Sequence, residues 1–373
     1  MLVIDAQTGD VVSEESPDAR QLPASTMKII TAITVLASLG REHRFATRVR
    51  QGPSNETGTE IILEGGGDPL LSRADLQQLA KKSARAISAA HDSSGLPGKP
   101  RVVLRTDTRL FPVTGRARGW PSDYVPSVAS TVQALALVGD YSTNPSKNAM
   151  DAFASYLRAE GIRVSRGESV ADESTHGFPV LAEVSDHTSA DAVRRMLSIS
   201  DNNVAEVLHR QVALARGISA DWAGATQATE DVLRELGLDP SDQAIMDGSG
   251  LSRKDRITPR FLVDALRLAR VTNPGPFTMM FEDDAMPVAG RTGTLDDAYG
   301  RFVTKKSKCA VGQARAKTGT LFDTIALSGL ATTVDGRERI FAFLVNDRPQ
   351  QYSALSTRQA LDGLVATVTE CWG

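Results

Sequence analysis

Hydrophobic positions at the start of the chain predict a hairpin followed by a helix. Two short apolar runs, Leu2–Ala6 and Val11–Ser13, flank a turn that contains glycine, a pattern typical of a β-hairpin. Residues 26–38 then repeat apolar side chains at helical intervals until Gly40, which favours the end of a helix. Ser25 is therefore expected at or near the N-terminus of a buried helix.

The pattern becomes more mixed in the next stretch of the chain. Strands are expected at 60–64 and 101–105 and helices at 74–90 and 149–160, with polar segments rich in Gly, Ser and Pro between them. We interpret residues 46–168 as an inserted α/β domain.

The remaining sequence is mostly helical and then returns to strands. Helices are expected at 190–197, 203–215, 222–236 and 259–270, strands at 324–332 and 339–346, and a closing helix at 353–368. Because strands occur near both ends of the chain, we expect one sheet assembled from both ends, in a domain made of residues 1–45 and 169–373.

Composition and charge narrow the class of protein. The 373 residues exceed a single small module, and 41% hydrophobic with 23% charged residues is typical of a folded globular protein. A net charge of −3 provides no basic field, so no nucleic-acid partner is expected. The apolar runs are too short to span a bilayer and no leader precedes the first strand, so we expect a mature or truncated chain without a transmembrane segment.

Side chains that bind metals are sparse. Cys309 and Cys371 are the only cysteines, which excludes a cysteine-based zinc site. The five histidines form no pair at metalloprotease spacing. We expect neither a metal nor another cofactor.

A Ser-x-x-Lys motif is the first candidate for chemistry. Ser25 and Lys28 are three residues apart, which places both side chains on one face of the expected helix. A neutral lysine amine held there can take the serine proton, and backbone N–H groups at a helix N-terminus favour developing negative charge. Taken alone, the same residues also fit an ordinary capped helix with a surface lysine.

Two further motifs follow in order. Ser200-Asp201-Asn202 comes just after a helical run, and Lys317-Thr318-Gly319 leads into the strand pair near the C-terminus. Together the three motifs resemble the signature set of the penicillin-recognising serine hydrolases. A near-duplicate, Arg291-Thr292-Gly293, runs into two aspartates and is interpreted as a loop, whereas Lys317 is expected at a sheet edge where an extended substrate can pair with the backbone.

Longer segments extend the resemblance to essentially the whole chain. They include Glu64–Leu70, Ala205-Glu206, Asp247–Ser252 and Ala316–Leu321. The chain resembles the class C low-molecular-mass penicillin-binding proteins, the D-alanyl-D-alanine carboxypeptidase/endopeptidases. The resemblance implies an α/β (α+β) fold: a β-lactamase/transpeptidase-like domain of three layers with a central antiparallel sheet, plus a smaller inserted α/β domain. The 175 positions from the first motif to the second fit the family's insertion but fall short of its longest members, so a third domain is expected to be missing.

The resemblance assigns roles to the first two motifs. Ser25 would be the acylated nucleophile and Lys28 its general base. Ser200 would pass the proton to the leaving D-alanine, and Asn202 would hold the substrate amide.

The resemblance also assigns the third motif to substrate binding. Lys317, Thr318 and Thr320 would bind the terminal carboxylate, on the strand that includes Gly319. The backbone N–H groups of Ser25 and Thr320 would form the oxyanion hole.

A separate set of residues suggests the specificity. In relatives that cleave diaminopimelate-containing peptidoglycan, a Trp and an Asp three positions apart help to bind the free end of the peptide side chain, and Trp120 and Asp123 reproduce this spacing. The Asp would pair with the ammonium and the Trp would pack on the stem. Leu321 lies where an apolar pocket residue is expected, whereas a tyrosine found in some relatives is Val128 here.

The implied activity sets the partners and the location. Peptidoglycan stem peptides would be the substrate and β-lactam antibiotics covalent inhibitors, so the chain is expected outside the cytoplasm, in the periplasm or cell envelope. Disulfides persist there, and we predict a bridge between Cys309 and Cys371 across 62 positions, worth about 4 kcal/mol on the chain-entropy model. Two free buried thiols are the alternative.

Three other functions compete with this interpretation. A class A β-lactamase is one, because Glu235-Leu236-Gly237-Leu238-Asp239 mimics the deacylation motif of that family; the apolar pattern instead favours Glu235 in the last turn of a helix closed by Gly237. A catalytically silent binding or scaffold protein is another, although all three motifs are intact. A Ser-His-Asp hydrolase is disfavoured because no Gly-x-Ser-x-Gly is present.

Overall fold

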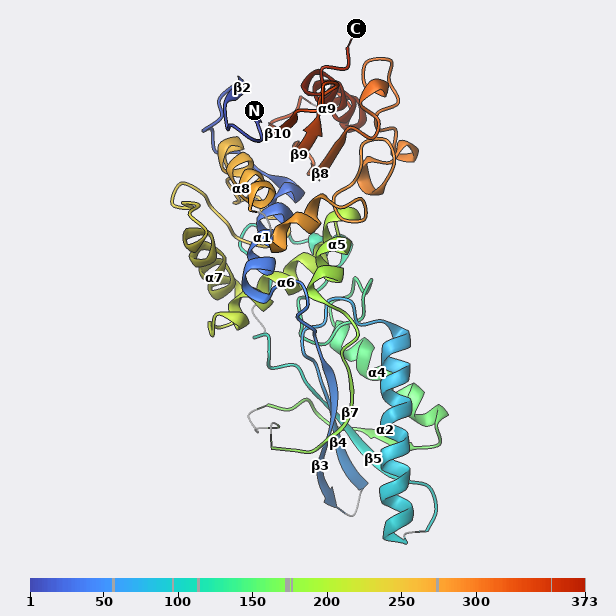
Figure 1. The fold of residues 1–373 in the computed structure, drawn as a ribbon. Coiled ribbons are helices and arrows are strands. Elements are labelled where there is room, and N and C mark those ends of the chain that lie inside the picture. The colour runs from blue at the N-terminus through green and yellow to red at the C-terminus, as the bar shows by residue number, and fades with distance from the viewer. Residues whose placement is uncertain are drawn as a thin grey trace.

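The computed structural model describes residues 1–55, 58–95, 97–112, 115–171, 175, 177–272, 275–349 and 351–372. These residues form two parts, each built on a five-stranded sheet (Figure 1). The part at the top of Figure 1 holds both chain termini, and the part at the bottom holds the second sheet with its long helix.

The first sheet joins the two ends of the chain. Its strands are β1 (Leu2–Asp5), β2 (Val11–Glu14), β8 (Ala314–Thr320), β9 (Ile325–Thr332) and β10 (Glu338–Val345). Their order is β2-β1-β10-β9-β8, and all neighbours are antiparallel. Leu2 lies opposite Ala342, which confirms the prediction of one sheet built from both ends.

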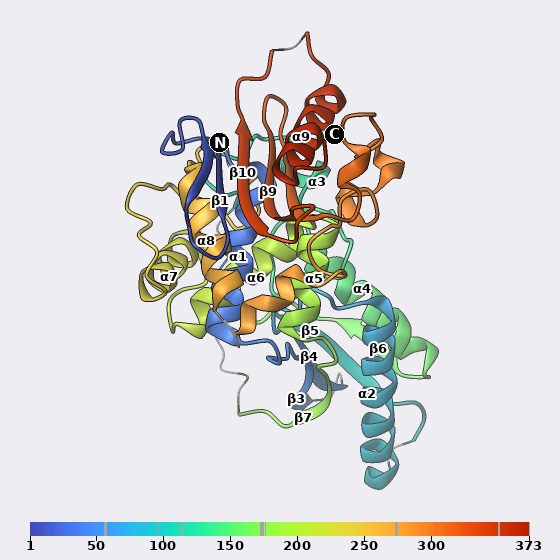
Figure 2. The same ribbon diagram turned by 45° about the horizontal axis from the view of Figure 1, so that its top comes forward.

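Both faces of this sheet are covered, which makes the three layers that the resemblance implied. In β10, Ile340 and Ala342 join the helical core that includes α8 (Pro259–Val271), whereas Phe341 and Phe343 join the core under α9 (Ala354–Val368). This alternation follows from the two-residue period of a strand. Figure 2 shows α9 beside β9, and α8 beside β1 and β10.

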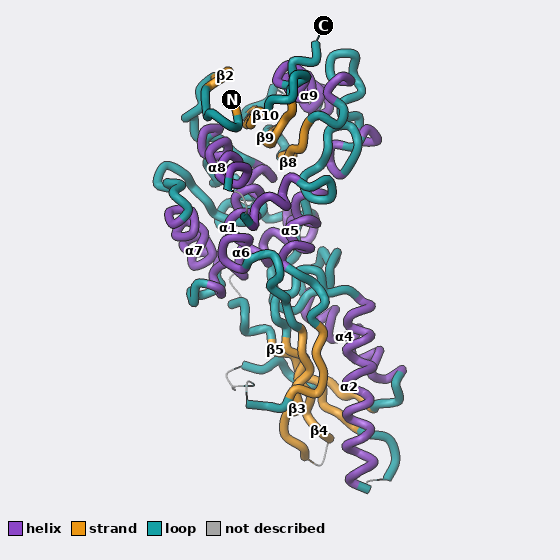
Figure 3. Tube along the Cα trace, viewed as in Figure 1, coloured by secondary structure: helices purple, strands orange, loops and turns teal. Residues whose placement is uncertain are grey.

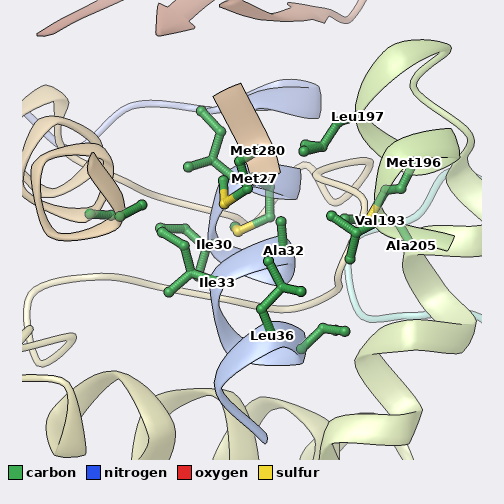
Figure 4. Close-up of a cluster of buried hydrophobic side chains, with 14 of the residues drawn as sticks. Met27, Ile30, Ala32, Ile33, Leu36, Val193, Met196, Leu197, Ala205 and Met280 are labelled. Atoms are coloured by element: carbon green, nitrogen blue, oxygen red, sulfur yellow. The ribbon is translucent and has the colours of Figure 1, made fainter. Parts of the chain in front are cut away.

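A helix at the centre of the first part carries the first motif. A single 3-10 turn, Ala24–Thr26, leads into α1 (Met27–Leu39), and every residue of α1 from Met27 to Leu36 is buried. Its neighbours are α5 (Ser189–Ser198), α6 (Asn202–Ala215), α7 (Trp222–Glu235) and α8. Figure 4 shows the apolar side chains that close around it, from Met27 to Leu36 on α1 and from Val193 to Leu197 on α5. Packing on all sides fixes the N-terminal end of α1.

The second sheet is mixed. Its strands are β3 (Thr47–Asn55), β4 (Gly58–Glu64), β5 (Arg101–Asp107), β6 (Arg163–Arg166) and β7 (Val180–Val184), in the order β6-β5-β4-β3-β7. The helices α2 (Arg73–Ser94) and α4 (Pro145–Ala159) pack against the sheet and each other around a separate hydrophobic core (Figure 3).

The second sheet extends beyond the predicted insertion. That prediction ended at residue 168, but β7 pairs with β3 and belongs to the same sheet. Neither β3 nor β6 was predicted from the sequence, because β3 contains Gly52 and Pro53 and β6 has only four residues, three of them polar. The inserted segment also reaches the first part, where Ala117, Trp120 and Ala129 pack against Ala24 and Leu251. Among the described residues, no helix is long and apolar enough to cross a membrane.

Candidate active site

All three sequence motifs open onto one cleft of about 500 Å³. Ser25 lies in the 3-10 turn before α1, Ser200 and Asn202 lie at the start of α6, and Thr318 lies on β8. The lining residues are Ser25, Tyr124, Val128, Ser200, Asn202, Leu251, Thr294, Tyr299, Arg301, Thr318, Thr320, Leu321, Phe322 and Arg358.

The amine of Lys28 lies beside the serine hydroxyl. Lys28 Nζ is 3.0 Å from Ser25 Oγ, 2.8 Å from Asn202 Oδ1 and 2.8 Å from the carbonyl oxygen of Ser249. The side chain is fully buried. A neutral amine has two N–H groups, which the Asn202 and Ser249 oxygens can accept, and its lone pair then faces the hydroxyl of Ser25.

Burial lowers the pKa of Lys28 to about 8. The carboxylates of Glu206, Asp247 and Asp201 act in the opposite direction and raise this pKa. A lysine with a pKa near 8 is neutral in about one molecule in ten at pH 7, and a serine hydroxyl needs such a base to become a nucleophile.

The loop Asp247–Ser252 packs against the turn that carries Ser25. Glu206 accepts hydrogen bonds from the backbone N–H groups of Gly248 and Ser249, at 3.1 and 2.8 Å. A Cβ on Gly250 would lie 1.9 Å from the carbonyl oxygen of Ala24, so only glycine fits there. Ala24 itself has a φ of 47°, a conformation that costs a non-glycine residue energy and is typical of functional sites.

The second motif forms the start of α6. Asp201 caps the helix by accepting a 3.2 Å hydrogen bond from the N–H of Val204, and it also pairs with Arg195. Ser200 has a φ of 61°, and Asn202 Nδ2 donates to the carbonyl oxygen of Val128 at 2.9 Å. The cap at Asp201 therefore fixes the side chains of Ser200 and Asn202 at the cleft.

The third motif lies on the edge strand β8, as the sequence predicted. Lys317 is fully buried, and its Nζ donates to the carbonyl oxygen of Thr318 at 2.9 Å. Burial and the nearby Lys28 hold the pKa of Lys317 well below its usual value. A Cβ on Gly319 would lie 2.9 Å from the carbonyl oxygen of Pro23, so glycine lets β8 approach the segment that carries the serine.

The near-duplicate motif contributes to the cleft through its last residues. Arg291 does not line the cleft, which agrees with its interpretation as part of a loop. Thr294, in the 3-10 turn Gly293–Leu295, lies 2.7 Å from the hydroxyl of Thr318 through its own hydroxyl and does line it.

Of the three predicted specificity residues, Leu321 lines the cleft, whereas Trp120 and Asp123 do not. Trp120 is 7% exposed, and its indole N–H donates to Asp247 Oδ2 at 2.6 Å. Asp123 is exposed and precedes the short helix α3 (Tyr124–Ser127). Leu321 lines the cleft, together with Tyr124 and Val128.

The family assignment now rests on sequence and on fold together. The D-Ala-D-Ala carboxypeptidase 3 (S13) family matches residues 1–143 and 125–368. The chain belongs to this family. Carboxypeptidase DacB of Mycolicibacterium smegmatis is 31% identical to the S13 chain over 382 residues, which cover 99% of this chain and 80% of the relative. The D-alanyl-D-alanine carboxypeptidase of an Actinomadura species is 26% identical over 443 residues, which cover 97% of this chain and 80% of the relative.

Solved structures share the fold of the S13 chain. Penicillin-binding protein 4 (dacB) of Haemophilus influenzae superposes with a TM-score of 0.78 at 20% identity and covers 99% of this chain and 94% of its own. A predatory peptidoglycan endopeptidase of Bdellovibrio bacteriovorus superposes with a TM-score of 0.61 at 17% identity. The match covers 99% of this chain and 91% of the endopeptidase chain.

The competing functions lose support from the same geometry. Glu235 ends α7, pairs with Arg216 on the surface and is absent from the cleft lining, so it does not occupy the place of a deacylating glutamate. Four of the five histidines are described, and none of these four lines the cleft. One of them, His209, is fully buried on α6, where burial lowers its pKa to about 3.

Several lining residues of the S13 chain were not singled out from the sequence. The repeated Gly-Thr-Leu after Arg291 could have indicated Thr294, since it copies the residues after Thr318. Tyr124, which also lines the cleft, is the next residue after Asp123, a predicted specificity residue. Arg358 carries no local signal, because it lies on α9 and reaches the cleft only through the fold.

Proposed function

We propose that this S13 enzyme is a serine D-Ala-D-Ala carboxypeptidase that acts on peptidoglycan stem peptides through an acyl-enzyme on Ser25. The observation that carries the proposal is the 3.0 Å contact between Ser25 Oγ and a fully buried Lys28 amine whose pKa is lowered to about 8. The named relatives of the same family are carboxypeptidases.

Acylation begins with the neutral amine of Lys28. It takes the Ser25 hydroxyl proton as Ser25 Oγ bonds to the carbonyl carbon between the two D-alanines. Negative charge develops on the carbonyl oxygen, which the backbone N–H groups of Ser25 and Thr320 receive; one such donor is typically worth about 3 kcal/mol.

Release of the leaving group completes acylation. The C–N bond breaks, and Ser200 passes the proton to the departing amine, so that D-alanine leaves as a neutral amine. A water then attacks the ester and Lys28 accepts the proton of that water. As the bond between the carbonyl carbon and Ser25 Oγ breaks, Lys28 returns this proton to the oxygen, which restores the hydroxyl and the neutral amine.

The binding roles follow from the position of each side chain. Asn202, held by Val128 and Lys28, presents its amide to the substrate backbone. The edge strand β8 offers backbone groups to an extended peptide, and its Thr318 and Thr320 hydroxyls bind the terminal carboxylate. Lys317 lies buried behind them and donates to the carbonyl oxygen of Thr318.

The specificity for a side chain with a free amine rests on Asp123. Its exposed carboxylate makes no hydrogen bond to any described residue and can pair with an ammonium group. We assign Trp120 to positioning rather than to direct contact, because its indole is buried against Asp247. Leu321 supplies apolar lining on the other side of the cleft.

The same acyl-enzyme extends to two further reactions. β-lactam antibiotics would acylate Ser25, and the H. influenzae protein of the same fold has been solved with a novel β-lactam. DD-endopeptidase activity on cross-links uses the same steps with a different leaving amine. Because the substrate lies in the cell wall, we place the enzyme outside the cytoplasm.

Mass spectrometry tests the proposal directly. After incubation with benzylpenicillin, the peptide that contains Ser25 should carry one covalent adduct, and the enzyme should release D-alanine from an acyl-D-Ala-D-Ala peptide. Rapid penicillin turnover without a stable adduct would indicate a β-lactamase. No reaction with either compound would indicate a silent binding protein.

A further inference from the structure

A guanidinium from the opposite layer of the molecule reaches the cleft. Arg358 lies in the second turn of α9, which packs on the face of the sheet away from α1. Its Nη2 donates to the hydroxyl of Thr320 at 3.2 Å, and the side chain lines the same cleft as Ser25.

The charge of Arg358 is not neutralised by the described residues around it. No ion pair joins Arg358 to a carboxylate in the part of the chain that the structure describes. Asp362, one turn further along α9, is occupied by Arg301, which contacts it at 2.5 Å, and by the backbone N–H of Phe302 at 3.0 Å. The described lining of the cleft contains two arginines and no acidic residue.

Two further arginines lie near Arg358. Burial, Arg301 and Arg348 lower the pKa of Arg358 and Asp362 raises it, but an arginine stays protonated in a protein. An anion bound next to this guanidinium would relieve the repulsion.

We propose that Arg358 binds the free carboxylate of the residue that leaves, at the Thr320 end of the cleft. This inference rests on the proposed function. Because the Thr320 hydroxyl accepts from Arg358, its own proton is free to donate to the same carboxylate. A charge-assisted hydrogen bond from an arginine is stronger than one from a neutral hydroxyl.

Lys317 cannot supply this contact. Its Nζ is fully buried, donates to the carbonyl oxygen of Thr318 and does not line the cleft. Arg301, the other arginine of the lining, is paired with Asp362. The selection of substrates with a free carboxyl end is therefore assigned to the Arg358 guanidinium, which contacts Thr320.

Two thioester substrates test the inference. They share one acyl-D-alanyl group and differ only in the leaving group, mercaptoacetate or its uncharged amide. R358Q should lower kcat/KM for the mercaptoacetate ester by about 10- to 100-fold and leave the amide ester within about twofold of wild type. R337Q, which removes a charge from an exposed turn, is the matched control and should change neither value.

The outcomes separate this inference from the proposed function. If R358Q keeps the wild-type preference for the carboxylate ester, Arg358 does not bind the carboxylate. If R358Q does not fold, R358K keeps the charge without the two-pronged geometry and should lose roughly 3- to 10-fold on the carboxylate ester alone; an unchanged preference would again overturn the inference. Failure of the wild-type enzyme to release D-alanine or to bind penicillin would contradict the proposed function instead.

Discussion

The indole N–H of Trp120 donates a buried 2.6 Å hydrogen bond to the carboxylate of Asp247. Asp247 also accepts from the backbone N–H groups of Gly250 and Ser252, each at 2.7 Å. Gly250 lies directly against the carbonyl oxygen of Ala24, next to the serine. The inserted segment is thus connected to the turn that carries Ser25 through one loop.

Trp120→Phe should loosen this loop. The substitution leaves one buried carboxylate oxygen with a donor fewer, which should cost about 1–3 kcal/mol of unfolding free energy. Penicillin acylation should slow by roughly 3- to 10-fold, because the serine is held less firmly. Urea unfolding and the rate of adduct formation measure the two effects.

Trp222→Phe is the control for this prediction. The Trp222 indole touches the Trp120 ring, but its N–H donates to an exposed carbonyl oxygen, that of Gly115, at 3.2 Å. Acylation in this variant should stay near wild type. Equal slowing in both variants would show that general packing, rather than the bond to Asp247, affects the serine.

Ser25→Ala should abolish both the penicillin adduct and the release of D-alanine. The side chain makes no cap to α1, so the fold should be retained. Lys28→Ala should also prevent acylation, because the hydroxyl then lacks a base. Adduct formation at the wild-type rate in either variant would exclude that residue from its assigned role.

The acylation rate should rise with pH and level off above about 8. In the proposed mechanism the neutral form of Lys28 is the base, and its fraction increases as the pH passes its pKa of about 8. Glu206→Gln removes a carboxylate that raises this pKa, so the rise should move to lower pH. Stopped-flow acylation between pH 6 and pH 10, a range that covers both sides of the lysine pKa, measures the shift; a rise at higher pH in the variant would contradict the sign of the Glu206 effect.

Asp123→Ala should discriminate between two peptides. KM should increase for a peptide with a free side-chain amine, by about fivefold or more for loss of an exposed ion pair at a binding site. The acetylated analogue should be affected little. Equal changes for both peptides would remove Asp123 from the specificity site.

The disulfide between Cys309 and Cys371 should hold the C-terminal end of the chain in place. The bridge is present, with Cα atoms 5.7 Å apart and 62 positions between them, as the sequence analysis predicted. Cys309→Ser with Cys371→Ser should lower the free energy of unfolding by about 4 kcal/mol. Activity at 25 °C should persist, since neither cysteine lines the cleft; an unchanged melting temperature would show that the bridge does not stabilise the fold.

Local sequence patterns predicted the helices other than the short α3 and many of the strands. The apolar repeat of 26–38 predicted α1, and the apolar runs near the C-terminus predicted β9 and β10. Such patterns depend on residues a few positions apart, so the sequence contains them completely. The strands β3 and β6 were not predicted, because β3 is interrupted by Gly52 and Pro53 and β6 is short and mostly polar, so that pairing with neighbouring strands rather than a local pattern establishes them.

The motifs indicated Ser25 and Lys28 as candidate reacting residues, whereas the tertiary structure determined their environment. Ser25 and Lys28 are brought together by one helix, so their contact could be predicted from spacing alone. The lowered pKa of Lys28 depends on burial and on Ser249 and Asn202, which lie 221 and 174 positions away. Arg358 reaches Thr320 only because α9 covers the sheet. Contacts of this kind depend on how layers pack, and no local period in a sequence encodes them.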